Sequence, residues 1–126
     1  MISDSNTKKD QLPDLHDWEI LGVRIDRFSR IAEITLHFPD EGRNAILRFY
    51  EVKKFFLSEM RIQNVILDML LFDARSESDY FIRSCQLLGI NPPDFDQQSG
   101  QKVLYIEPSV GVEMACCFSH FEYIEK

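Results

Sequence analysis

The amino-acid sequence predicts an α+β fold, with a mainly antiparallel, twisted sheet of about six or seven strands and one packed helix. Two observations lead to this fold class. From about residue 16 onward, apolar and polar residues alternate over most of the chain, which is typical of strands that bury one face. Only residues 77–88 combine a helical spacing of apolar residues with signals for both helix ends. Most predicted links between strands are shorter than the dozen or so residues of a parallel crossover, so neighbouring strands should run antiparallel.

The 126 residues are enough for one hydrophobic core and too few for a second. Residues 1–13 are polar and end at Pro13, so we expect a flexible N-terminal tail there. Residues 14–126 then form a single α+β domain. Ten of its aromatic residues are Phe, whose side chain carries no polar atom and therefore suits the core.

The first three predicted strands are joined by short turns. Residues 16–26 form a strand whose apolar side chains change face, and a β-bulge near Gly22 would bring them back to one face. Residues 30–38 alternate without interruption, and the polar residues before them suit a hairpin. A turn at residues 39–42, which contains Pro, Asp and Gly, leads to a third strand over residues 45–50.

The middle of the chain continues in extended structure. Residues 51–60 fit both a helix and a strand, and we favour the strand because neither Tyr50 nor Glu51 is a good helix N-cap. Residues 64–72 are apolar on both faces apart from Asp68, which indicates a central strand that is covered on each side.

The single predicted helix covers residues 77–88. Ser76 stands before it with Asp79 three residues later, as in a capping box, and Gly89 follows in the position of a left-handed C-cap. The buried stripe of this helix consists of Phe81, Cys85 and Leu88.

A polar loop over residues 94–100 follows the helix and leads to the last two strands, over residues 101–107 and 111–124. The turn between them makes an antiparallel hairpin. The apolar face of the last strand changes side near His120, where we expect a bend or a bulge.

Net charge restricts the partners of this protein. The formal net charge is −7 and it is uneven: residues 1–63 carry 10 basic and 11 acidic side chains, whereas residues 64–126 carry 4 and 10. Because the sequence has no cluster of Lys and Arg, we expect binding neither to nucleic acid nor to an anionic membrane surface. A basic protein partner would be attracted, mainly through faster association.

Three sequence features indicate a cytoplasmic protein. No apolar run approaches the roughly 20 residues of a membrane helix. Residues 1–10 are polar and lack the apolar stretch of a signal peptide. The three Cys are an odd number without metal-type spacing, which suits a reducing compartment.

Motifs for common chemistries are missing from the sequence. The five Gly are isolated and build no phosphate-binding loop, and there is neither a Gly-x-Ser-x-Gly elbow nor a His-Glu-x-x-His helix. We therefore expect no cofactor, no metal and no catalytic residue set, and an enzyme is the less favoured hypothesis.

Four residues are candidates for a binding site: His16, Asp17, Trp18 and His120. An imidazole beside a carboxylate can act as a general base when a cleft holds its pKa near neutral. Adjacent residues of a strand point to opposite faces, so His16 and Asp17 could serve one substrate only where the strand has not yet begun. In the structural alternative, one of them caps the start of the strand and Trp18 covers the edge of the core.

A metal site would need a particular pairing of strands. His37 and His120 could bind a metal together with Asp68 only if the strands that carry the two histidines were neighbours. Nothing in the sequence requires this, and a histidine on the exposed face of a strand is the simpler interpretation.

The remaining reactive or charged residues have structural explanations that we favour. Cys85 and Cys116 suit the core as small hydrophobic residues, and Cys117 is the cysteine to test for thiol reactivity. Lys53 and Lys54 suit an edge strand, where lysine opposes aggregation.

Short motifs are spread over residues 14–124: Leu15-His16-Asp17, Asp26, Asn64-Val65-Ile66 and Ile106-Glu107-Pro108-Ser109-Val110-Gly111. In these motifs the chain resembles a group of small bacterial proteins of uncharacterised function, some of which are similar to immunity-type proteins of polymorphic toxin systems. The resemblance implies an antiparallel-rich α+β domain without a known catalytic residue set. It also favours extended structure for residues 51–60, and it transfers no site residue.

These observations predict a non-enzymatic protein-interaction module, immunity-like or regulatory, that presents an acidic surface to a protein partner of basic character. The alternative is a small-molecule-binding domain or minor enzyme that uses a cleft near His16, Asp17 and His120. A homodimer joined through exposed strand edges is compatible with the first hypothesis.

Overall fold

The computed structural model describes residues 7–9, 12–95 and 97–126. These residues form nine strands, one α-helix and two short 3-10 helices. The strands are β1 (Thr7–Lys9), β2 (Glu19–Asp26), β3 (Ile31–Phe38), β4 (Arg43–Tyr50), β5 (Lys54–Leu57), β6 (Val65–Phe72), β7 (Lys102–Val110), β8 (Met114–Phe118) and β9 (His120–Glu125). Helix α1 spans Asp79–Leu88, and the 3-10 helices cover Pro92–Asp94 and Gln97–Ser99.

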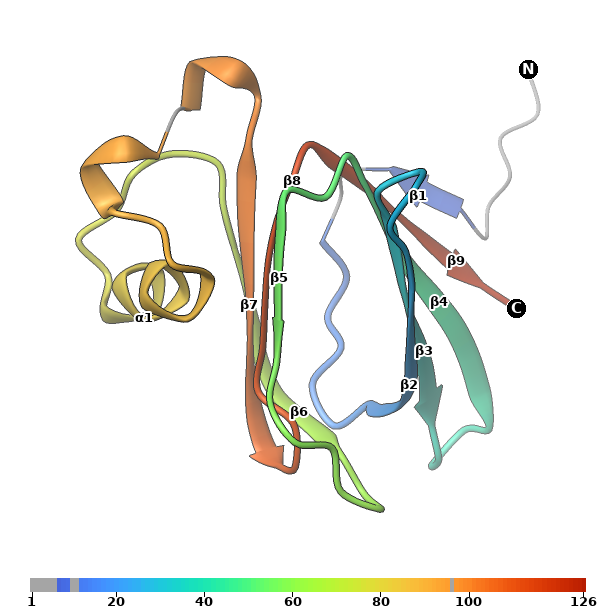
Figure 1. The fold of residues 1–126 in the computed structure, drawn as a ribbon. Helices are drawn as coiled ribbons and strands as arrows, with labels where there is room; N and C mark the ends of the chain where they lie inside the picture. Colours follow the sequence, from blue (N-terminus) through green and yellow to red (C-terminus); the bar gives the residue numbers. More distant parts are fainter. Residues whose placement is uncertain (1–6, 10–11, 96) are drawn as a thin grey trace.

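The nine described strands belong to one antiparallel sheet with the order β1-β9-β4-β3-β2-β6-β7-β8-β5. Strands β2 and β6 are joined through the pair Glu19 and Val65. At this narrow link the sheet folds over into a five-stranded half, β1-β9-β4-β3-β2, and a four-stranded half, β6-β7-β8-β5. Figure 1 shows the two halves facing each other, with α1 on the outer side of the four-stranded half.

Two apolar clusters hold these layers together. The larger cluster lies between the halves and includes the fully buried Ile34, Leu47 and Leu104. The smaller cluster packs α1 against the outer face of the four-stranded half, through residues such as Phe81 and Cys85. Strands β7 and β8 are therefore covered on both faces, which explains why they are apolar on both sides. Strand β6 was expected to be covered in the same way, but Leu67 and Asp68 on it are exposed.

Two strands pass from one half of the sheet to the other at a shared bend, which we name the corner. Here β4 leads into β5 and β8 leads into β9, so the β4–β9 pair continues as the β5–β8 pair. The backbone N–H of Ser119 donates to the carbonyl oxygen of Tyr50 (3.1 Å), and that of Lys53 donates to the carbonyl oxygen of Cys117 (2.8 Å). Glu51 turns the chain with a left-handed φ of 53°.

Three phenylalanines fill the inner side of the corner. Phe49, Phe118 and Phe121 are each 0% exposed, and their ring centroids lie 4.9, 6.0 and 6.3 Å apart. Burying each side chain stabilises the fold by roughly 1.5–3 kcal/mol. Phe118 and Phe121 both point inward although they are three residues apart, because the bend at Ser119 interrupts the alternation of the strand. The bend predicted near His120 is thereby confirmed.

The antiparallel α+β fold class is confirmed, but the number of strands differs from the prediction. From residue 14 onward the described chain has eight strands rather than six or seven. The bend at Ser119 divides the last predicted strand, residues 111–124, into β8 and β9. Of the expected tail, residues 1–6 and 10–11 lie outside the described residues, and Thr7–Lys9 pairs with β9 as strand β1.

Local irregularities of the first strand follow the prediction. The register between β2 and β3 shifts between Ile20 and Gly22, which confirms a bulge beside Gly22. The bulge turns Leu21 outward, where 57% of it is exposed, while Ile20 stays in the core. For residues 51–60 the strand is confirmed over Lys54–Leu57, which form β5 at the edge of the sheet, and the residues on either side of it form no helix.

The predicted C-terminal end of the helix is confirmed, and the predicted N-terminal end is corrected. Gly89 ends α1 with a left-handed φ of 70°. At the start, Ser78 replaces Ser76 as the cap, because the Ser78 hydroxyl accepts the backbone N–H of Tyr80 (3.2 Å). The Ser76 hydroxyl instead accepts the backbone N–H of Ser78 (3.0 Å), so the helix begins two residues later than expected.

Asn64 is buried and ties the loop before β6 to the turn between β7 and β8. Its Oδ1 accepts the backbone N–H groups of Arg61 (2.9 Å) and Val112 (3.0 Å), and its Nδ2 donates to the carbonyl oxygen of Arg61 (2.7 Å). Gly111 packs against this amide with a φ of +88°, and a Cβ there would come within 2.4 Å of Asn64 Oδ1. The turn therefore has no room for a side chain at position 111.

Gly111→Ala should lower the free energy of unfolding by about 2–4 kcal/mol, since it combines a left-handed φ with a clash against buried polar atoms. Gly42→Ala is the matched control, because Gly42 has a φ of +63° and nothing within 4 Å of an added Cβ. The control should lose only about 1 kcal/mol. Denaturant titrations measure both values, and equal losses would contradict the close approach of Asn64.

Candidate functional site

The candidate residues His16 and Asp17 lie on an exposed turn just before β2. Leu15 and Trp18 on either side are buried, at 2% and 3% exposure, so the turn presents the two polar residues to solvent. Asp17 has a left-handed φ of 69°, and His16 Nε2 lies 3.4 Å from Asp17 Oδ1. Because the strand begins after both residues, the structure does bring these two side chains together.

His16 is also tied to β6. Its Nδ1 lies 2.6 Å from the carbonyl oxygen of Leu67. This hydrogen bond is the main cause that raises the pKa of His16, and the carboxylate of Asp17 raises it further, with smaller effects of Asp14 and Asp68. The side chains of His16 and Asp17 are 54% and 63% exposed, so the pair lies on an open surface and not in a cleft.

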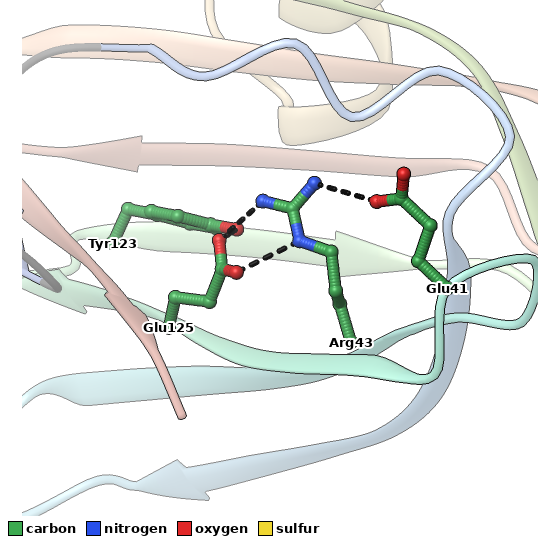
Figure 2. A network of polar contacts seen from close by, with 4 residues as sticks. All are labelled: Glu41, Arg43, Tyr123 and Glu125. Atoms are coloured by element: carbon green, nitrogen blue, oxygen red, sulfur yellow. Dashed lines mark hydrogen bonds and ion pairs between the residues drawn. The ribbon is translucent and has the colours of Figure 1, made fainter.

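Trp18 lies beneath a network of polar contacts, which Figure 2 shows. The guanidinium of Arg43 lies 5.1 Å above its ring and pairs with Glu125 through hydrogen bonds of 2.7 and 2.5 Å. Arg43 also contacts Glu41 (3.3 Å), and the hydroxyl of Tyr123 donates to Glu125 (2.9 Å). Hydrogen bonding to Glu125 raises the pKa of Arg43. Trp18 thus supports a paired network and offers little of its ring to a ligand, in line with the structural alternative.

His120 lies apart from the other three candidates. It is at the corner, on the outer face of β9, where its ring stacks on Tyr50 with centroids 4.6 Å apart. Its Nδ1 is 3.9 Å from a carboxylate oxygen of Glu51. His16, in contrast, contacts β6 in the other half of the sheet. The structure therefore provides no common cleft for His16, Asp17 and His120.

Most charges on the outer face of the five-stranded half are paired. Arg24 contacts Glu33 (3.3 Å), Glu33 accepts a 2.5 Å hydrogen bond from Arg48, and Arg48 lies 3.6 Å from Glu122. The hydroxyl of Tyr50 donates to Glu122. We name this row, which crosses β2, β3, β4 and β9, the charge ladder. Arg24 is exposed, whereas Glu33, Arg48 and Glu122 are half-buried. Ion pairs at a surface contribute about 0–1 kcal/mol each, so the ladder is a neutral surface more than a source of stability.

A second surface carries carboxylates that form no ion pair with a described Lys or Arg, and we name it the acidic face. Asp68 on β6 lies opposite Glu107 on β7. The five carboxylates of the acidic face are Asp14, Asp17, Asp68, Asp79 and Glu107. Asp14, Asp17 and Asp68 raise the pKa of His16. Glu107, Asp68 and Asp79 raise the pKa of Tyr80. None of the five forms an ion pair with a described Lys or Arg.

Two exposed apolar side chains lie within the acidic face. Leu67 is 42% exposed beside Asp68, and Tyr80 is 37% exposed at the start of α1. The Tyr80 hydroxyl donates to Glu107 (3.2 Å), and its ring lies 5.8 Å from that of Tyr105. These contacts hold the tyrosine in place between the helix and the sheet.

A third feature is a cavity of about 300 Å³ between the β2–β3 hairpin and the corner. Four basic residues line it: Arg27, Arg30, Lys53 and Lys54. None of them forms an ion pair with a described carboxylate. Asp26 is the single acidic residue of the lining, and backbone N–H groups of the hairpin turn hydrogen-bond to it and lower its pKa. We name this feature the cationic cavity.

The described residues offer no metal site. His37 pairs with Asn44 and His120 pairs with Tyr50, at opposite ends of β4, so the two histidines cannot meet around Asp68. In the part of the chain that the structure describes, no group of three His, Cys, Asp or Glu residues could hold a metal ion.

The three cysteines are free and buried. Cys116 points into the cluster between the halves, and Cys117 points into the cluster around α1. Burial raises the pKa of Cys117, and the nearby Lys53 and Lys54 oppose this effect. The thiolate, which is the reactive form, is therefore disfavoured and out of reach of solvent.

Comparisons with known proteins assign no family to this chain. No protein-family model matches it, and no similar protein was found among curated proteins or solved structures. The resemblance to immunity-type proteins therefore stays a prediction. The described residues contain no helix with the length and apolar character needed to cross a membrane.

Sequence reasoning placed the candidate site at His16, Asp17, Trp18 and His120 and missed the cationic cavity. Lys53 and Lys54 were interpreted as edge-strand lysines, and β5 is indeed an edge strand. The available signal was the concentration of basic residues before residue 64, but the sequence does not show that Lys53 and the hairpin lie side by side.

The pKa of His16 should lie above its ordinary value of 6.5. Asp17→Asn should lower the pKa only in part, because the hydrogen bond to Leu67 remains. Protonation of His16 then contributes stability that is fully present below pH 6.5 and is lost as the pH rises through the raised pKa. An NMR titration of the imidazole measures the pKa. Asp40→Asn, on the β3–β4 turn, is the control, and a wild-type pKa at or below 6.5 would contradict the two contacts.

The thiols of the native protein should not react with a disulfide reagent such as dithionitrobenzoate, because all three are buried. After denaturation, three thiols per chain should react. Rapid labelling of one thiol in the native protein, mapped to Cys117, would show that the β5–β8 edge opens far more easily than its packing indicates.

Proposed function

We propose that this protein is a non-enzymatic interaction module, immunity-like or regulatory, whose acidic face binds a basic protein partner. One observation supports the proposal above all others. The five carboxylates of the acidic face form no ion pair with a described Lys or Arg, and among them only Asp17 contacts a histidine, whereas the carboxylates of the charge ladder and of the network in Figure 2 pair with arginines.

Unpaired like charges favour association with an opposite surface. Carboxylates at close range repel one another, and a basic partner would relieve this repulsion on binding. The field of such a patch also steers a basic protein during diffusion and raises association rates by about 10- to 1,000-fold at low salt. The net charge of −7 extends this attraction beyond the patch itself.

The apolar side chains of the acidic face give a partner something to pack against. Interfaces commonly surround a tyrosine or an aliphatic anchor with polar residues that stay near water. Tyr80 and Leu67 have this position, and the contacts of Tyr80 with Glu107 and Tyr105 hold it before any partner arrives. A side chain that is already ordered loses little freedom on binding.

A small-molecule site or minor enzyme at His16, Asp17 and His120 has less support. The first two residues form a pair on an open turn, and His120 stacks on Tyr50 at the corner. None of the three residues lines either of the two described cavities, which are the cationic cavity and a smaller one beside Glu77 and Pro92.

The three free cysteines favour a cytoplasmic location for the module.

The double variant Asp68→Asn/Glu107→Gln should weaken partner binding by roughly tenfold or more and flatten its salt dependence. The wild-type protein is used to capture partners from the native cell, and a captured basic protein is identified and purified. Its dissociation constant and association rate are then measured with both forms of the module at several salt concentrations.

Asp40→Asn/Asp94→Asn is the matched control, because it removes two exposed carboxylates outside the acidic face and changes the net charge equally. The control should bind the purified partner almost as the wild type does. If the two double variants lose the same affinity, net charge and not the acidic face is responsible. In the remaining case the partner is a second copy of the chain. Light scattering of the purified protein would then show a dimer for the wild type and a monomer for the Asp68→Asn/Glu107→Gln variant.

A further inference from the structure

We propose that the cationic cavity binds a small amphiphilic anion, an organic phosphate or carboxylate with a short apolar chain. The site lies between the β2–β3 hairpin and the corner, and none of its lining residues belongs to the acidic face. The inference is therefore independent of the proposed function.

The cavity gathers four basic residues that form no ion pair with a described carboxylate. Acidic residues outnumber basic ones by 21 to 14, so partners for basic side chains are plentiful. Arg24, Arg43, Arg48 and Arg83 each pair with a carboxylate. Arg27, Arg30, Lys53 and Lys54 have no such pair, and all four border one space of about 300 Å³. A bound anion would supply the opposite charge that these residues lack.

The two segments that supply these charges are held together by the backbone. The N–H of Val52 donates to the carbonyl oxygen of Arg30 (2.9 Å), which joins the corner to the hairpin. Arg30 has a left-handed φ of 57°, which a non-glycine residue adopts only where the surroundings stabilise it. The hydrogen bonds of the corner fix Lys53 on the opposite wall. An anion would thus meet a site that is assembled before binding, which reduces the entropy lost on association.

The apolar part of the lining indicates more than an inorganic ion. Ile25 is 54% exposed inside this region, whereas Val52 and Phe55 pack against the cluster between the halves. A hydrocarbon chain over Ile25 and Phe55 would remove this apolar surface from water, while its charged head contacts the basic residues. The volume is at the lower end of the roughly 300–1,000 Å³ of ligand sites, so the ligand should be small.

A lipid headgroup could offer the same chemistry as a free organic anion. Phe28 at the tip of the hairpin is 86% exposed, and the guanidinium of Arg27 lies 4.9 Å from its ring centroid. The experiment therefore compares a soluble amphiphile with vesicles, and in both cases the cavity residues are expected to carry the binding.

Octyl phosphate is the probe, with inorganic phosphate and octanol as its charged and apolar fragments. Amide NMR spectra of the full chain should show saturable shifts at residues 25–31 and 52–55 with octyl phosphate. Each fragment should bind at least about tenfold more weakly, since it lacks one of the two contacts. Vesicles of phosphatidylcholine with phosphatidic acid are tested by co-sedimentation.

Two pairs of variants separate the cavity from general charge and hydrophobicity. Lys53→Gln/Lys54→Gln should weaken octyl phosphate binding by about tenfold. Arg61→Gln/Lys126→Gln removes two basic side chains elsewhere and should leave it unchanged. Ile25→Ser should weaken binding, whereas Leu21→Ser, at the similarly exposed bulge of the same strand, should not. All six substituted side chains are exposed, so the variants are expected to fold.

Octyl phosphate binding that is lost only in the cavity variants supports the proposal. If vesicles also bind in a cavity-dependent way, the source of the anion is a lipid, and if they do not, it is a soluble molecule. The proposal is overturned if octyl phosphate causes no saturable shifts, if the shifts lie outside the two segments, or if both lysine and control variants bind equally. Vesicle binding that the cavity variants do not change also overturns it.

Discussion

The backbone hydrogen bonds of the corner are the constraint on which the rest of the structure depends. They join Ser119 to Tyr50 and Lys53 to Cys117, so that two adjacent strands bend together and one long sheet becomes two facing halves. Three buried phenylalanines fill the inner side of the bend and stabilise it. It also sets the positions of residues outside the core. Val52 is drawn to the hairpin carbonyl, and Lys53 and Lys54 are left at the mouth of the cationic cavity.

Charge is distributed unevenly over this frame, and pairing distinguishes the surfaces. Across β2, β3, β4 and β9 the arginines and glutamates neutralise one another, and the network around Arg43 does the same above Trp18. The acidic face along β6, β7 and the start of α1 and the cationic cavity at the corner instead gather several charges of one sign. The binding roles proposed for the two regions depend on these charges.

The fold was largely predictable because its signals are local. The alternation of residues 30–38, the bulge beside Gly22 and the left-handed cap at Gly89 each depend on a few neighbouring residues. The errors arose where neighbours in space decided the outcome. Ser76 and Ser78 are both suitable caps, and their mutual hydrogen bond assigns the role to Ser78. The last strand was expected to bend, but only its successive pairing with β5 and with β4 divides it in two.

By itself the sequence determined the fold class, most strand segments, the presence of one helix and the acidic balance, because periodicity and turn chemistry act over a few residues. It also placed His16 beside Asp17. The tertiary structure alone decided that Asp68, Asp79 and Glu107 share a face with Asp14 and Asp17, and that Arg27 and Arg30 face two lysines at least 23 positions along the chain. Electrostatic neighbours depend on distances in space of a few ångströms, and those distances are set by which strands pair and where the sheet bends.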